Sequence, residues 1–211
     1  MPNHFFSFLR NTSKNLHAIG AFFPSSQFVG RAMAEPIPPL PKTDYKVLEV
    51  GAGTGTITRE ITKKLEHAGT LDVYELLPDF CKILRQKIQF HPDFKKMAGR
   101  IHLHEGNVLD FQPTTKTFDL IISEVPLTNF SPEQVRHFFN HYQTLLKPGG
   151  ELVWIEYFLL RNFQKPFITK ERRGKLEAIE KVQQEFSKKH EFAQKVVFLN
   201  LPPALIHYLR F

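Results

Sequence analysis

Short apolar runs alternate along this chain with segments in which apolar residues recur every three or four positions. The runs have the length of β-strands, and they cover residues 46–50, 70–74, 100–104, 118–123 and 151–157. The periodic segments are typical of helices with one buried face, and they cover residues 57–65, 78–90, 132–146 and 169–189. Strands and helices that alternate in this way predict an α/β fold with a mostly parallel sheet.

A further helix is expected near the N-terminus, after Pro24-Ser25-Ser26. Serine is a favoured N-cap, and we expect Phe28, Ala32 and Met33 to face inward from this helix. Four prolines between residues 36 and 41 then end it. The proline-rich stretch is therefore interpreted as a connector into the first strand.

A glycine-rich loop separates the first predicted strand from the helix that follows it. The loop reads Gly51-Ala52-Gly53-Thr54-Gly55, and Glu49 stands two residues before its first glycine. Glycine permits positive φ and leaves room for a ligand against bare backbone. The free N–H groups at the start of the next helix face the same ligand. This strand–loop–helix unit predicts a cofactor site.

The spacing of the glycines distinguishes two kinds of cofactor loop. Dinucleotide-binding loops use G-x-G-x-x-G, whereas this chain has G-x-G-x-G. A second acid, Glu75, ends the next predicted strand, and a carboxylate there can accept both hydroxyls of a ribose. A nicotinamide or flavin domain is the alternative, and Glu49 and the position of the third glycine both argue against it.

The pattern E-x-G-x-G-x-G with a later acid resembles the class I S-adenosylmethionine-dependent methyltransferases. The resemblance implies a Rossmann-like α/β fold, with a mostly parallel seven-stranded sheet, helices on both faces and an antiparallel edge strand. It also implies that the loop wraps the methionine end of S-adenosylmethionine and that Glu75 holds the ribose. Asn107 stands where the family usually has an acid for the adenine amino group, and its amide oxygen can still accept that bond. The implied cofactor-binding residues are Glu49, Gly51, Ala52, Gly53, Gly55, Glu75, Leu76, Asn107 and Val108, together with Ser25 and Ser26.

Length and composition limit the remaining possibilities. The 211 residues are expected to form one domain. Its expected parts are a helical lid at 1–35, a cofactor-binding core at 42–157, a basic helical insertion at 158–193 and closing strands at 194–211. Those closing strands, residues 195–199 and 205–211, would form the antiparallel edge.

Several classes of protein are made less probable by the composition. The one cysteine, Cys81, excludes an internal disulfide. The ten histidines are scattered, so no metal site is predicted. No apolar run approaches the roughly 20 residues of a membrane span, and no secretory signal is recognisable. We therefore expect a cytoplasmic protein.

The net charge of +7 is unevenly distributed along the chain. Residues 1–35 carry +2, residues 36–156 carry −1 and residues 157–211 carry +6. A neutral core with basic attachments predicts an anionic partner surface, either lipid headgroups or nucleic acid. Residues 4–23 are apolar with basic flanks, which fits a bilayer interface or a helix that covers the cofactor. The two roles are compatible.

Three stretches outside the glycine loop resemble the soluble bacterial phospholipid N-methyltransferases. They are Phe8-Leu9-Arg10-Asn11 with Ile19-Gly20-Ala21 and Pro24-Ser25-Ser26, then Val125-Pro126-Leu127 with Asn129-Phe130, and finally Asn200-Leu201-Pro202-Pro203-Ala204. This resemblance implies a phospholipid amine as substrate, with phosphatidylethanolamine converted towards phosphatidylcholine. It also implies peripheral association with the inner face of an anionic cell membrane. The sequence does not indicate an oligomeric state.

Two other functions remain as alternatives. The ribosomal RNA adenine dimethyltransferases have a similar cofactor loop, but they need an Asn-hydrophobe-Pro-aromatic tetrapeptide to hold a flipped base. This chain has Glu124-Val125-Pro126-Leu127 at that place, which makes a nucleic-acid substrate the weaker interpretation. A non-catalytic lipid-surface or cofactor-binding module is the third alternative, and the complete glycine loop argues against it.

Glu124 is the predicted catalytic residue, at a position where the resembled family usually has a small side chain. It follows a buried strand, and ligands of open α/β sheets lie at the carboxyl ends of the strands. A sulfonium methyl group is already activated, so the enzyme has to align a neutral amine and exclude water. A nearby carboxylate can take the proton of the ammonium form. A hydrogen bond to the cofactor or a helix cap is the alternative role for Glu124.

Overall fold

The computed structural model describes residues 25–97, 99–157 and 169–211. The predicted apolar segment at 4–23 and residues 158–168 of the predicted insertion lie outside this part of the chain.

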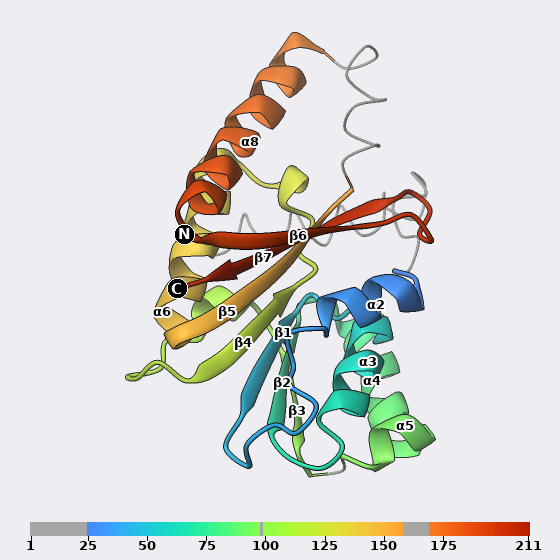
Figure 1. The fold of residues 1–211 in the computed structure, drawn as a ribbon. Helices are drawn as coiled ribbons and strands as arrows, with labels where there is room; N and C mark the ends of the chain where they lie inside the picture. Colours follow the sequence, from blue (N-terminus) through green and yellow to red (C-terminus); the bar gives the residue numbers. More distant parts are fainter. Residues whose placement is uncertain (1–24, 98, 158–168) are drawn as a thin grey trace.

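A seven-stranded sheet forms the centre of the fold, with the order β3-β2-β1-β4-β5-β7-β6. The strands are β1 Lys46–Val50, β2 Thr70–Glu75, β3 Ile101–Glu105, β4 Phe118–Ser123, β5 Leu146–Glu156, β6 Glu191–Val197 and β7 Ala204–Arg210. Neighbours from β3 to β5 run parallel, whereas β7 is antiparallel to both β5 and β6. This arrangement confirms the predicted Rossmann-like sheet with antiparallel pairing at one edge (Figure 1).

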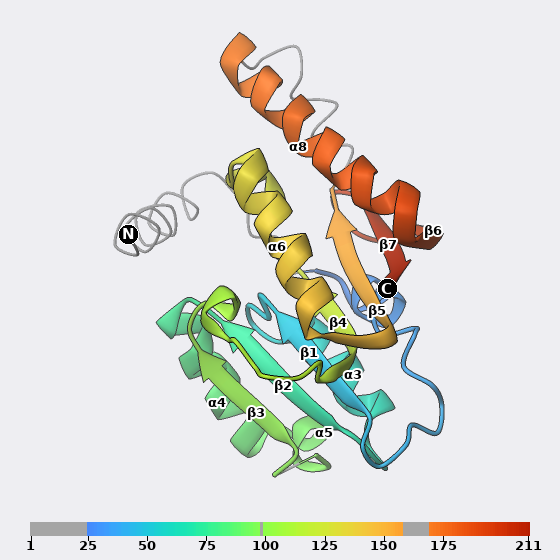
Figure 2. The same cartoon turned by 90° about the vertical axis from the view of Figure 1, so that its left-hand side faces the viewer.

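Helices cover both faces of the sheet (Figures 1 and 2). One face carries α2 Gln27–Met33, α3 Thr56–Lys64, α4 Pro78–Phe90 and α5 Pro92–Lys95, and the other carries α6 Pro132–Leu145 and α8 Lys170–His190. Two short 3₁₀ turns, η1 Val108–Asp110 and η2 Leu127–Asn129, follow β3 and β4.

The apolar strands form two cores because both of their faces are buried. In β1, Val47 faces the α2–α5 side and the next residue, Leu48, faces the α6 and α8 side, as the two-residue period of a strand requires. The predicted apolar stripe of α8 is confirmed, since Leu176, Ile179 and Val182 are all buried. Helices on both faces explain why the central strands are continuous apolar runs.

The structure corrects one expectation about α2. Phe28 was predicted to face inward, but its side chain is 39% exposed and lies near the Arg31 guanidinium. Ser26 is the N-cap, so the helix begins at Gln27 and buries Val29 in place of Phe28, while Ala32 and Met33 are buried as predicted. Phe28 therefore falls on the solvent side of a helix whose other side packs against α3.

Two strand boundaries also differ from the expected ones. Residues 147–150, which lie between the predicted helix 132–146 and the predicted strand 151–157, belong to β5, because Leu146 already pairs with Phe118 and the Gly149 N–H donates to the Phe211 carbonyl. β6 starts at Glu191, four residues earlier than expected, directly after α8. Its first six side chains are exposed or half-buried, so the sequence has no alternation of apolar and polar residues that would mark where the strand starts.

Candidate active site

The carboxyl ends of four neighbouring strands place the predicted site residues along one edge of the sheet. The Gly51 N–H donates to the Tyr74 carbonyl at 2.9 Å, and the Glu124 N–H donates to the Val50 carbonyl at 2.9 Å. The Gly106 N–H donates to the carbonyl of Glu75, also at 2.9 Å. These bonds continue the strand pairing into the loops, at the edge where ligands of open α/β sheets bind.

The glycine loop has one glycine that faces open space and one that permits a close backbone approach. Gly53 has φ +54°, and a Cβ built on it would meet no described atom within 4 Å. A Cβ on Gly51, at φ +80°, would lie 3.4 Å from the Glu124 carbonyl carbon. Gly51 thus lets the loops after β1 and β4 approach each other, and Gly53 leaves bare backbone accessible to a ligand.

The second predicted acid lies directly against this loop. Glu75 is buried, with Oε2 accepting the Gly53 N–H and Oε1 accepting the Leu77 N–H, both at 2.8 Å. Burial raises the pKa of Glu75, and the two backbone bonds oppose that rise. Leu76 follows at the half-buried end of β2. The structure therefore brings together the loop and the acid that the sequence placed at one site.

Glu49 is the most unusual carboxylate of the site. It is 1% exposed, and neither of its oxygens has a hydrogen-bond partner among the described residues. Burial raises the pKa of Glu49 to about 8, the nearby Thr58 opposes this rise, and the charges of Glu124 and Glu75 add to it. A buried carboxylate without a partner is costly. This position therefore fits a cationic group of a ligand that would supply the missing partner.

Glu124 forms a hydroxyl–carboxylate cluster with two residues from distant parts of the chain. The Ser25 hydroxyl donates to Oε1 of Glu124, and the Tyr157 hydroxyl lies 2.8 Å from the Ser25 oxygen and 3.5 Å from the same Oε1. Burial raises the pKa of Glu124 to about 7, while the Ser25 and Tyr157 hydrogen bonds oppose the rise. Both contacts fall on Oε1, so Oε2 is the oxygen left to meet a donor.

The two residues predicted at the adenine end follow β3. The Asn107 side-chain oxygen accepts the Leu109 N–H at 3.1 Å and so caps η1. Val108 is buried, and its carbonyl accepts a hydrogen bond at 2.9 Å from Nε2 of His141. The capping bond uses one lone pair of the Asn107 oxygen and leaves the other for a second donor.

Two residues of the site region were not selected from the sequence, Tyr157 and Asn200. The Asn200 side-chain oxygen accepts the Ser26 N–H at 2.8 Å, and its amide nitrogen donates to the Pro202 carbonyl at 2.7 Å. Ser26 in turn caps α2 by accepting the Val29 N–H. The sequence contains the stretches around Ser26 and Asn200 but gives no sign that they meet. The available signal was a single polar residue, Asn200, within Asn200-Leu201-Pro202-Pro203.

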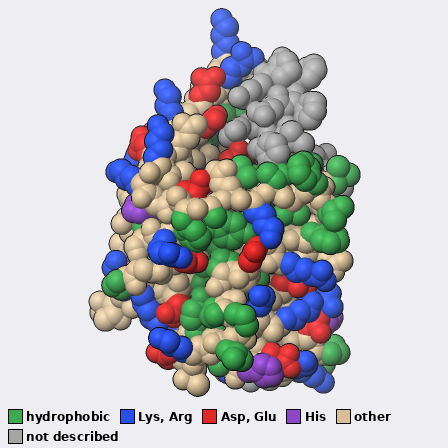
Figure 3. Space-filling view, in the orientation of Figure 1, with side chains coloured by type: hydrophobic (Ala, Val, Ile, Leu, Met, Phe, Trp, Pro, Cys, Tyr) green, Lys and Arg blue, Asp and Glu red, His purple; other side chains and the backbone are tan. Residues whose placement is uncertain are grey.

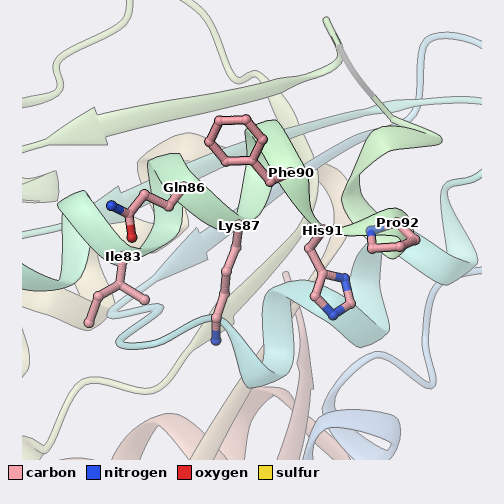
Figure 4. Close-up of a pocket in the computed structure, with 6 residues that line it drawn as sticks. All are labelled: Ile83, Gln86, Lys87, Phe90, His91 and Pro92. Carbon is pink, nitrogen blue, oxygen red and sulfur yellow. The ribbon is translucent and has the colours of Figure 1, made fainter.

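A separate hollow beside α4 has a different character (Figure 4). It is lined by Ile83, Gln86, Lys87, Phe90, His91 and Pro92 and contains none of the site carboxylates. Its Lys87 ammonium donates to the Thr54 carbonyl at 2.6 Å. Lys87 therefore supports the glycine loop, although the hollow is lined by none of the residues predicted for the site.

Two further types of feature are absent from the described ranges. No cluster of three or more His, Cys, Asp or Glu side chains there could hold a metal ion. Among those residues, no helix is both long and apolar enough to cross a membrane.

Comparisons with known proteins agree with this geometry. Residues 47–150 match the family model of the methyltransferase domain. The chain is a class I S-adenosylmethionine-dependent methyltransferase. The open backbone at Gly53, the unpaired Glu49 carboxylate and the adjacent Glu75 fit that cofactor, which carries an ammonium group and a ribose.

Relatives of this methyltransferase include a lipid-modifying enzyme. The ornithine lipid N-methyltransferase of Singulisphaera acidiphila is 29% identical over 170 residues, which are 75% of this chain and 84% of that protein. Two solved structures share the fold. The O-methyltransferase from Bacillus cereus, in complex with SAH, has a TM-score of 0.66 at 14% identity and covers 97% of this chain and 91% of its own. The N-methyltransferase NodS from Bradyrhizobium japonicum has a TM-score of 0.57 at 17% identity, with coverages of 87% and 83%.

Proposed function

We propose that this methyltransferase transfers methyl groups from S-adenosylmethionine to the amine of a membrane lipid, converting phosphatidylethanolamine towards phosphatidylcholine. The observation that carries the proposal is the cluster of Glu124, Ser25 and Tyr157 at the edge where the cofactor loop lies. The ornithine lipid N-methyltransferase supports a lipid amine as the class of acceptor, because its name states that chemistry.

The cofactor half of the site is assigned to the first three strands. The backbone at Gly53 and the carboxylate of Glu49 would hold the methionine end, with Glu49 opposite its ammonium group. Glu75 and Leu76 would hold the ribose, and Asn107 and Val108 the adenine. The cofactor supplies a methyl group on a sulfonium, so the protein has to bind, orient and exclude water.

Glu124 is assigned the role of taking a proton from the amine that receives the methyl group. An ammonium group has no lone pair and must lose a proton before it can attack a methyl group. Because the pKa of Glu124 is raised to about 7, the residue is partly ionised at neutral pH and matched to proton transfer there. Ser25 and Tyr157 hold Oε1, which leaves Oε2 to accept the proton.

The pH dependence of kcat/KM tests this role, because it reports the ionisations of the free enzyme and free substrate. Activity of the wild type is expected to rise with pH through about 7 as Glu124 loses its proton. Glu124→Gln is expected to lose most turnover and this limb, with unchanged cofactor affinity. Tyr157→Phe keeps the carboxylate but removes a bond that lowers its pKa, so its limb should move to higher pH. A Glu124→Gln enzyme with a wild-type rate, or with altered cofactor affinity alone, would refute the proton-acceptor role.

The acceptor is identified by offering labelled cofactor with three substrates in parallel. Vesicles of phosphatidylethanolamine, vesicles of ornithine lipid, and ribosomal RNA are each incubated with enzyme, and the labelled fraction is recorded. We expect label in the phosphatidylethanolamine. Label in RNA would refute the proposal and favour adenine methylation, although buried Leu127 provides no aromatic surface for stacking.

We further infer the organisation of the whole chain from its charge and its site. Residues 1–211 are assigned to one domain, whose basic C-terminal part adjoins an anionic membrane. The protein would then associate peripherally with the inner face of the cell membrane. Binding to anionic vesicles that does not weaken as salt rises would contradict this placement.

A further inference from the structure

The loop that joins β6 to β7, residues 198–203, is here called the hairpin tip. Phe198, Leu199 and Leu201 are 76%, 66% and 74% exposed, and the tip contains no charged residue. Three large exposed apolar side chains within four positions are unusual for a surface loop, since isolated ones are the norm. In Figure 1 the β6–β7 hairpin projects from the sheet, and Figure 3 shows hydrophobic side chains gathered in that region.

The strand directions place the hairpin tip at the same edge of the sheet as the catalytic cluster. β7 runs antiparallel to β5, so Leu205, just after the tip, pairs with Glu156, just before Tyr157. Asn200 within the tip bonds the Ser26 N–H, and neighbouring Ser25 bonds Glu124. The apolar tip is therefore connected to the Glu124 carboxylate through two hydrogen bonds and the peptide unit between Ser25 and Ser26.

Basic residues adjoin the same end of the sheet. Lys175, in the first half of α8, donates to the Asn129 carbonyl of η2, the turn that follows Glu124 and Val125. Arg172, one turn earlier on α8, is exposed. Anionic lipids present negative headgroups above an apolar layer, and an apolar protrusion in the C-terminal part of the chain, where residues 157–211 carry a net charge of +6, complements both layers.

We propose that the hairpin tip inserts into the lipid surface, with Phe198, Leu199 and Leu201 among the acyl chains and the basic start of α8 against anionic headgroups. This inference rests on the proposed lipid substrate and explains how it reaches the site. A lipid amine next to the inserted tip would meet Glu124 while its acyl chains stay in the bilayer. The tip thus selects for membrane-bound over water-soluble amines.

Sedimentation of the full chain with vesicles tests the insertion. The probe vesicles contain phosphatidylglycerol and phosphatidylethanolamine, and the test variant carries Phe198→Ser, Leu199→Ser and Leu201→Ser. The matched control carries Phe90→Ser and Leu40→Ser, two exposed apolar residues that are not part of the tip. We expect the tip variant to bind roughly a thousandfold more weakly, since burial of each of the three side chains contributes about a tenfold factor. The control should bind like the wild type.

A fluorescent side chain gives a second measurement that does not depend on loss of binding. Leu201→Trp should show a blue-shifted emission on adding vesicles and quenching by lipids with brominated acyl chains. The native Trp154 is buried, so the wild type provides the baseline. An emission that vesicles leave unchanged would overturn the insertion.

Activity separates failure of this inference from failure of the proposed function. If both hold, the tip variant loses methylation of vesicle lipid but keeps activity on a short-chain, monomeric phosphatidylethanolamine and keeps affinity for S-adenosylhomocysteine. If the wild type methylates no lipid yet its vesicle binding depends on the tip, the proposed function fails alone. If the wild type methylates lipid and the tip variant binds vesicles equally well, the insertion is wrong.

Thermal stability gives a further check on the tip variant. Lowered thermal stability of this variant with unchanged vesicle binding would also overturn the insertion, because the tip would then be covered by the protein's own chain.

Discussion

The ionisation of Glu49 leads to a prediction whose size follows from the structure. The pKa of this buried carboxyl is raised from 4.5 to about 8, and each unit corresponds to about 1.4 kcal/mol between the two protonation states. The folded state therefore favours the protonated form. The contribution of protonated Glu49 to stability is fully present below pH 4.5 and is lost as the pH rises through about 8. The cost of ionising Glu49 should reach about 3 kcal/mol at pH 7 and about 5 kcal/mol at pH 9.

Glu49→Gln removes this ionisation while keeping the shape of the side chain. A buried amide without partners adds its own cost, but that cost does not depend on pH. The informative quantity is therefore the difference in unfolding free energy between variant and wild type, which should shift in favour of the variant by about 5 kcal/mol from pH 4 to pH 9.

Urea unfolding of the ligand-free protein at several pH values measures this difference. Glu66→Gln is the control, because the pKa of Glu66 is lowered by its bond to Lys96 and the pH dependence should have the opposite sign. A difference for Glu49→Gln that stays flat across this range would refute the reasoning, since Glu49 would then titrate alike in the folded and unfolded states.

Two further substitutions test the cofactor loop and the connection to the hairpin tip. Gly53→Val should weaken S-adenosylhomocysteine binding at least about tenfold, because the side chain enters the open space beside the loop. Gly99→Val, which also has positive φ and open surroundings, should share the backbone strain but leave affinity unchanged; equal calorimetric affinities for both variants would contradict the loop assignment. Asn200→Ala should cost about 1–3 kcal/mol in chemical unfolding and lower kcat/KM, because the Ser26 N–H loses its acceptor. The exposed Asn140→Ala should do neither, and an Asn200→Ala enzyme with wild-type kinetics would show that the Ser26 contact does not position the acceptor cluster.

The central elements were predictable because their residues are buried on known faces. The bounds of β1 and β4 agree with the predicted runs, and Val135, Phe138 and Phe139 of α6 are buried as their spacing indicated. β6 was misplaced because its exposed residues show no period that burial would impose. The position of Phe28 depended on which serine caps α2, and neighbouring serines are equally good candidates by type.

Contacts between distant residues account for what the sequence could not show of the site. The Glu49–Gly55 loop and Glu75 lie within one strand–helix–strand unit, so their proximity follows from a right-handed parallel connection. Ser25 and Tyr157 are 132 positions apart, and Ser26 and Asn200 are 174 apart. Their contacts depend on how α2 and the β6–β7 hairpin pack onto the sheet, which local patterns do not report.

The division of the site along the chain suggests where substrate choice is encoded. The methyltransferase family match spans residues 47–150, which include the cofactor loop, Glu75 and Glu124. Ser25 and Tyr157, which contact Glu124, lie outside it, and so does Asn200, which accepts the Ser26 N–H. The proposed cofactor half is thus built from the part of the chain that matches a general methyltransferase model. The proposed acceptor half is built largely from the flanking parts, so exchange of those segments between relatives should change the acceptor while leaving cofactor binding intact.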